Sequence, residues 1–224
     1  ESPERSGEAL RISDPNAYRA VARNAATCSG APPLLHFRLA PNLSPKRPKG
    51  AAVESWPIGV FASIDAGLGV KLEVARELGV PTIQLHAPAA ATRTRRNAEE
   101  FTARLEGMGI QLTAVFGGFE GESYADIPTV VRTVGLVPPE TRAARTQEMK
   151  EIADFAKLLG CEVVALHLGF IPHDASDPLY AEVLDVTREV CDHCAANGQN
   201  LHLETGQETA DGLLRFLHDV DRRN

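Results

Sequence analysis

Three polar side chains end short apolar segments of this sequence, namely His86, His167 and Glu204. A carboxylate that is buried without a partner costs several kcal/mol, so Glu204 would need a cation, a metal or a dense set of hydrogen bonds. A single histidine in such a place is more often a hydrogen-bonded core residue, but three polar strand ends in one chain favour a shared site. We therefore interpret Glu204 as a functional carboxylate and the two histidines as candidate residues of the same site.

The direction of these side chains follows from the geometry of a strand, in which successive residues face opposite sides. The apolar Ile83 and Leu85 share one face of their strand, which leaves His86 on the other face. The same alternation separates His167 and Glu204 from their apolar neighbours. All three are expected on the inner face near the carboxyl ends of parallel strands, where barrel enzymes keep their chemistry.

The elements that must position these residues form a repeat that begins near Trp56. Each unit has a short apolar strand, a loop, an amphipathic helix and then a glycine that can end the helix in a left-handed conformation. Alternation of strands with helices implies parallel pairing through right-handed crossovers. The predicted strands are 57–64, 80–86, 110–116, 161–168 and 199–204, the predicted helices are 66–78, 95–108, 140–159, 178–197 and 209–221, and the helix-ending glycines are Gly79, Gly109, Gly160 and Gly198.

Two architectures suit such a repeat, an open doubly wound sheet or part of a closed barrel. The open sheet usually carries a glycine-rich phosphate loop after its first strand. Residues 63–69 offer only Gly67 and Gly69, with no third glycine at the required spacing. We therefore predict an α/β fold, a (β/α)₈ TIM barrel in residues 55–224, of which the first five strand–helix units are present and the barrel is incomplete.

Residues 1–54 differ from the repeat that follows them. The segment 41–50 is rich in proline and basic residues and has no apolar periodicity. Such composition is typical of a linker or a tail. The sequence predicts that residues 1–54 form an irregular N-terminal extension outside the barrel.

Charge and composition restrict the partners and the compartment. The net charge of −7 argues against nucleic acid as a partner, and no apolar run approaches the length of a membrane span. The four cysteines are irregularly spaced and no export signal precedes them, which indicates reduced thiols and a cytoplasmic protein. Cys191 and Cys194 have CxxC spacing within a helical pattern and lack a second ligand pair, so we interpret them as structural thiols.

Three segments around these strand ends resemble a known family. They read Ile-Gln-Leu-His-Ala-Pro at 83–88, Ala-Leu-His-Leu-Gly-Phe at 165–170 and Leu-Glu-Thr-Gly-Gln-Glu-Thr at 203–209. Their order and spacing are similar to those of the xylose-isomerase-like TIM-barrel superfamily, and most similar to its sugar phosphate isomerase/epimerase branch. The resemblance covers about residues 56–224.

The resemblance implies a metal-dependent isomerase or epimerase that transfers a proton next to the carbonyl of a small sugar or sugar phosphate. In that family four strands supply the ligands of one divalent metal, and Glu204 matches the first of them. Glu204 would then be both a metal ligand and a catalytic carboxylate, with His86, His167 and Gln207 binding the substrate. The metal would be Mn²⁺, Mg²⁺ or Co²⁺ rather than Zn²⁺. Because the other three ligands belong to later strands, we expect this 224-residue chain to be inactive by itself.

Two alternatives remain open at the level of the sequence. Endonuclease IV, a metal-dependent DNA-repair hydrolase of the same superfamily, has similar strand ends, although the acidic chain argues against it. The other alternative is a non-catalytic barrel fragment used for assembly, because open strand edges can pair with another chain. That chain could be a second copy, which would make a homo-oligomer. The glycine-rich segment 116–124 suits either a mobile loop over a substrate or an ordinary surface loop.

Overall fold

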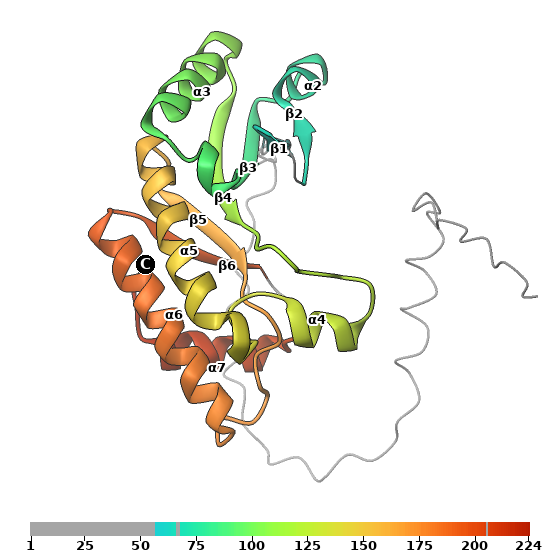
Figure 1. Ribbon diagram of the computed structural model, residues 1–224, viewed down its shortest axis with the longest axis vertical. Coiled ribbons are helices and arrows are strands. Elements are labelled where there is room, and N and C mark those ends of the chain that lie inside the picture. Colours follow the sequence, from blue (N-terminus) through green and yellow to red (C-terminus); the bar gives the residue numbers. More distant parts are fainter. Residues whose placement is uncertain (1–56, 66–67, 205) are drawn as a thin grey trace, which may run out of the picture. The chain divides into compact units, whose positions relative to one another are not determined.

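The computed structural model describes residues 57–65, 68–204 and 206–224 of the chain (Figure 1). The predicted N-terminal extension, residues 1–54, lies outside the described residues. Six parallel strands form one sheet in the order β2-β1-β3-β4-β5-β6. The strands are β1 Gly59–Ser63, β2 Val70–Lys71, β3 Thr82–His86, β4 Gln111–Gly117, β5 Val163–His167 and β6 Asn200–Glu204.

Every predicted strand is present, and the predicted helices are present with shifted ends. The helices are α2 Leu72–Glu77, α3 Arg95–Met108, α4 Ile127–Thr133, α5 Pro139–Leu158, α6 Pro178–Ala196 and α7 Ala210–Val220, with the short 3₁₀ helix η1 at Ala90–Thr92. The four glycines predicted to end helices have φ values of 68°, 67°, 70° and 76°, in the left-handed region. Asp177 caps α6 as its position before Pro178 suggests, accepting a hydrogen bond of 2.9 Å from the Leu179 N–H.

The structure corrects the prediction in two places. The helix expected over 66–78 spans only Leu72–Glu77, because Val70 and Lys71 pair with β1 as a short strand. The connection after β4, where no helix was predicted, contains α4. The Asp126 side chain caps α4 by accepting a hydrogen bond of 2.8 Å from the Thr129 N–H.

The helices α3, α5 and α6 cover one face of the curved sheet (Figure 1). On that face the strand residues are buried, as with Ile83 and Leu85 of β3 and Val164 and Leu166 of β5. Between its buried neighbours, Gln84 points the other way and is exposed. In the described part of the chain, helices on one face and polar side chains on the other are the arrangement of a barrel wall, whereas a doubly wound sheet has helices on both faces.

None of the helices that the structure describes is both long and apolar enough to cross a membrane.

Candidate active site

The three predicted strand-end residues lie on the same face of the sheet. His167 stands opposite Glu204, at the ends of β5 and β6. His86 ends β3, and the register runs from His86 to Phe116 and from Phe116 to Ala165, which shares its face with His167. Directly opposite residues of paired strands point to the same side. The structure therefore brings His167 and Glu204 together and places His86 on the far side of β4.

His86 is only partly accessible, and its surroundings favour the neutral imidazole. Burial lowers its pKa below the ordinary value of 6.5, while the carboxylates of Glu122 and Asp65 act in the opposite direction. Its Nδ1 atom is buried and has no hydrogen-bond partner among the described residues. Gly118 packs against the other nitrogen so closely that a Cβ atom there would lie 2.6 Å from Nε2. Only a glycine leaves this ring in place.

His167 is buried with a fixed hydrogen-bond direction. Its Nδ1 accepts a hydrogen bond of 3.1 Å from the Gly169 N–H, within the turn that follows β5. A nitrogen that accepts a hydrogen bond carries no proton, so the neutral ring holds its proton on Nε2. The ring is therefore a hydrogen-bond donor at Nε2, as a substrate oxygen would require.

Glu204 is exposed at the end of β6, and its carboxylate has no hydrogen-bond or ion-pair partner within the described part of the chain. An unpartnered carboxylate at a strand end fits one position of a divalent-metal site. In the described ranges, however, no group of three or more His, Cys, Asp or Glu side chains could hold a metal ion. The residues present thus supply one ligand and do not form a complete metal site.

Gln207 and Glu208 lie in the loop between β6 and α7. The Gln207 Oε1 atom is buried without a partner among the described residues. The Glu208 carboxylate accepts a hydrogen bond of 2.9 Å from the Gly206 N–H. Glu208 therefore shapes the loop itself, whereas the structure brings no described partner to the Gln207 oxygen.

The loop after β4 is anchored by the side chain of Glu122. Its carboxylate accepts hydrogen bonds from the N–H groups of Phe119, at 3.2 Å, and Gly135, at 2.8 Å. Ser123 is tied to Thr133 by a hydrogen bond of 3.1 Å from its N–H to the threonine hydroxyl. The glycine-rich segment is thus held at several points, in contrast to a freely mobile loop.

This anchored loop carries a site residue that the sequence did not single out, Tyr124. The tyrosine ring lies edge-on to the His167 ring with 6.0 Å between the centroids. Partial burial, together with the negative charges of Glu122 and Glu204, raises the pKa of Tyr124 to about 12, so its hydroxyl stays protonated at neutral pH. The glycines around position 118 indicated a loop near the substrate, but the tyrosine's place depends on the fold of that loop.

A groove of about 640 Å³ opens between Tyr124 and His86. The Arg93 guanidinium closes one side, donating hydrogen bonds of 2.6 Å to the Glu148 carboxylate and 2.8 Å to the Pro88 carbonyl. Glu120 also lines the groove. This groove, largely apolar with a few charged side chains at its edge, lies beside His86 at the carboxyl ends of the strands, which is the position of a barrel substrate site.

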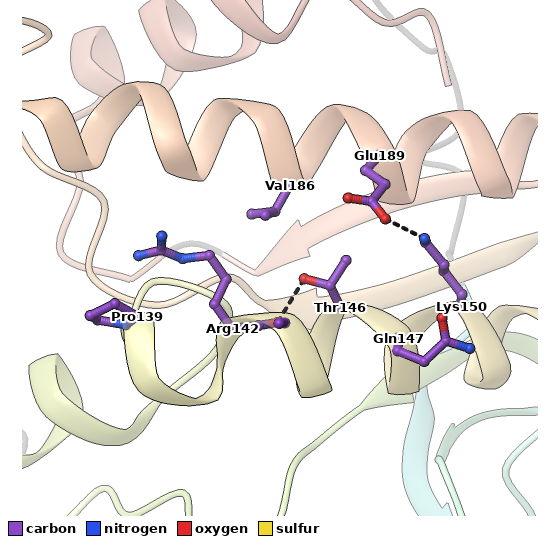
Figure 2. A pocket seen from close by; sticks show the side chains of 8 residues that line it. Pro139, Arg142, Thr146, Gln147, Lys150, Val186 and Glu189 are labelled. Atoms are coloured by element: carbon purple, nitrogen blue, oxygen red, sulfur yellow. Dashed lines mark hydrogen bonds and ion pairs between the residues drawn. The ribbon is translucent and has the colours of Figure 1, made fainter.

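A second groove, of about 350 Å³, lies between α5 and α6 on the outer helix layer (Figure 2). Its polar side chains are already paired, because Lys150 is bonded to Glu189 and the Thr146 hydroxyl donates to the Arg142 carbonyl over 2.8 Å (Figure 2). Paired groups on a helix–helix seam leave little free capacity for a ligand. This groove therefore is not the candidate active site.

The CxxC thiols of α6 are structural, as interpreted from the sequence. Cys191 and Cys194 are buried and free. Burial raises the pKa of Cys191 to about 11 and that of Cys194 to about 12. Thiols with such pKa values carry almost no thiolate at neutral pH and are poor nucleophiles and metal ligands.

Comparison with known proteins gives one family and one near structural relative. The sequence profile of the family described as xylose isomerase-like TIM barrel matches residues 72–224. A xylose isomerase domain protein from Planctomyces limnophilus is 60% identical, with a TM-score of 0.74 over 75% of this chain and 60% of that chain. The chain thus spans less than two thirds of that relative's length. No curated protein matches.

More distant solved structures share the fold. An L-ribulose 3-epimerase is 18% identical with a TM-score of 0.53, over 68% of this chain and 51% of that chain. A xylose isomerase-like TIM barrel protein from Mycobacterium smegmatis, in complex with magnesium, is 21% identical with a TM-score of 0.51, over 75% of this chain and 62% of that chain.

Proposed function

Because this chain belongs to the xylose isomerase-like TIM barrel family, we propose that the whole protein containing it is a metal-dependent isomerase or epimerase of a small sugar. One observation carries the proposal. The carboxylate of Glu204, without a partner among the residues that the structure describes, stands opposite the buried donor His167 at the carboxyl ends of two paired strands. A base beside a hydrogen-bond donor is what proton transfer next to a carbonyl requires.

In the proposed reaction Glu204 takes a proton from the carbon next to the substrate carbonyl. Isomerisation follows when that proton is delivered to the former carbonyl carbon, while the proton of the neighbouring hydroxyl moves to the former carbonyl oxygen, so that the neighbouring carbon becomes the new carbonyl. The Nε2–H of His167 donates to a substrate oxygen and stabilises the negative charge that develops there. His86, at the end of β3, and Gln207, after β6, bind substrate hydroxyls on either side of this pair.

A divalent metal, when bound, would polarise the carbonyl and stabilise the enediolate. Glu204 would be one of its ligands, and the described residues supply no complete set. We keep Mn²⁺, Mg²⁺ or Co²⁺ as the proposed ion, and Mg²⁺ and Mn²⁺ are hard cations that prefer carboxylate oxygens. The magnesium in the Mycobacterium smegmatis relative supports this choice.

We also propose that the protein works in the cytoplasm. That it assembles as a homo-oligomer is a further part of the proposal. The free thiols of Cys161, Cys191 and Cys194 support a reducing compartment.

The test is ketose turnover by the whole protein with Mn²⁺, assayed on a panel of ketopentoses and ketohexoses. We expect the isosteric variant Glu204→Gln to reduce kcat by at least about 100-fold, the low end for a positioned acid or base. Glu162→Gln is the matched control, because Glu162 is an exposed carboxylate just before the amino end of β5, away from the carboxyl ends that form the site. Full activity of Glu204→Gln contradicts the assignment, and cleavage of abasic DNA without ketose turnover supports the hydrolase alternative instead.

A further inference from the structure

Tyr124, in the loop after β4, lies close to the predicted strand-end residues. It lines the groove together with His86. Its ring meets the His167 ring edge-on. Glu204 stands opposite that histidine at the end of the neighbouring strand β6. Tyr124 therefore lies beside the strand-end residues of β3 and β5, next to the end of β6.

Tyr124 is exposed, whereas Tyr180, another tyrosine of the chain, is buried and hydrogen-bonded. The Tyr180 side chain is 4% exposed, packs on Phe216 and donates its hydroxyl to Asp219 over 2.8 Å. Tyr124 is 55% exposed, and within the described residues its hydroxyl has no hydrogen-bond partner. Exposing that much aromatic surface gives up hydrophobic stabilisation of about 25 cal/mol per Å². The fold therefore does not account for an aromatic residue at this position.

The exposed ring is nevertheless held in place. Ser123, the residue before it, is tied to Thr133, and Glu122 fastens the same loop at two backbone N–H groups. An aromatic ring presented by an anchored loop can bind a ligand with little loss of conformational entropy. Aromatic rings with a polar tip suit ligands that have both apolar C–H faces and hydroxyl groups.

The charges around the groove select among such ligands. Glu120, Glu122 and Glu148 line it, and Arg93, the one cation among its described lining residues, is already bonded to Glu148. Glu204 adds another carboxylate opposite His167, whose ring Tyr124 meets. The net negative charge of these carboxylates repels a phosphate.

We infer that Tyr124 forms the wall of a substrate subsite between His86 and Glu204, and that this subsite takes an uncharged polyhydroxylated carbon chain rather than a phosphate ester. The inference rests on the proposed function, whose site it shares. The ring packs on the C–H face of the substrate, and the hydroxyl donates to a substrate oxygen.

The experiment measures binding of two unreactive probes, xylitol and xylitol 5-phosphate, to the whole protein by calorimetry. Neither probe has a carbonyl, so binding is separated from turnover. We expect Tyr124→Ala to weaken xylitol binding at least about tenfold and Tyr124→Phe about threefold, since phenylalanine keeps the ring and loses one neutral hydrogen bond. Ile127→Ala is the matched control, because Ile127 is 62% exposed on the nearby α4 and does not line the groove.

The outcomes separate this inference from the proposed reaction. The inference is overturned if Tyr124→Ala binds xylitol as tightly as the wild type does. It is also overturned if the wild type does not bind xylitol, or if it binds xylitol 5-phosphate more tightly than xylitol. If xylitol binding depends on Tyr124 but no ketose is turned over, the inference stands and the proposed reaction fails. If Glu204-dependent turnover is found and Tyr124→Ala leaves kcat and KM unchanged, only the inference fails. Unchanged thermal unfolding of each variant verifies that the fold is intact.

Discussion

The imidazole of His86 couples the candidate site to pH. Its pKa is lowered mainly by burial, and its Nδ1 has no partner among the described residues. In the unfolded chain the same group titrates near the ordinary value of 6.5. Between the two pKa values the unfolded state binds more protons than the folded state does. The folded state therefore loses stability as the pH falls through 6.5.

We therefore expect the free energy of unfolding to drop between pH 7.5 and pH 5.5, and part of that drop to disappear in His86→Gln. Urea unfolding at several pH values measures the difference, and the NMR titration of the His86 ring should give a midpoint below 6.5. His218→Gln is the control, since that side chain is 90% exposed. An equal pH dependence of wild type and His86→Gln would contradict the stated environment.

The strand-end residues could be predicted from the sequence, whereas Tyr124 could not. Alternation along a strand is local, so apolar Ile83 and Leu85 were sufficient to orient His86. The place of Tyr124 depends on Glu122 reaching Gly135, thirteen positions further along the chain. No pattern of neighbouring residues encodes such a contact. The roles of Glu204, His86, His167 and Gln207 themselves stay predictions.

The helices and strands with a clear apolar periodicity could be predicted from the sequence, whereas two short elements could not. The strand β2 has two residues and is defined only by its pairing with β1. The helix α4 has seven residues, several of them β-branched, and too few turns for an apolar stripe to show. Asp126 followed by Pro128 was the one local sign of its start.

The connection from α4 to α5 is held against the end of β5 by close backbone contact. The Leu136 N–H donates to the Leu168 carbonyl over 2.8 Å. Arg145 donates to the carbonyls of Thr133 and Gly135, at 2.7 and 2.9 Å. A Cβ atom on Gly135 would lie 2.1 Å from the Leu168 oxygen, and its φ is +72°.

We expect Gly135→Ala to lower the free energy of unfolding by at least about 3 kcal/mol, through backbone strain and displacement of this connection. Gly121→Ala is a matched control, with a similar φ of +82° and no atom within 4 Å of the added Cβ. It should cost only about 1 kcal/mol, the strain alone. Urea unfolding of both variants measures the two losses. Equal losses would show that the contact with β5 is unimportant.

At the scale of the whole molecule, the described sheet supplies one wall of a barrel and one wall of a site. The exposed Gln84, His202 and Glu204 lie on the face away from the covering helices. In a closed barrel of this family the opposite wall would face them. Substrate contacts can come from this wall alone, but an octahedral metal needs several oxygen ligands at once.

This difference predicts how the 224-residue chain responds to metal by itself. With Glu204 as a lone carboxylate ligand and no described group of three ligands, we expect Mn²⁺ to bind weakly, with a Kd above about 1 mM. Paramagnetic broadening of NMR signals measures this, and the His167 ring should broaden first because it stands opposite Glu204. Glu204→Gln should remove that broadening, while Glu162→Gln should not. Stoichiometric binding at micromolar Mn²⁺ would instead mean that the chain forms a complete metal site, and that the opposite wall is not needed to hold the ion.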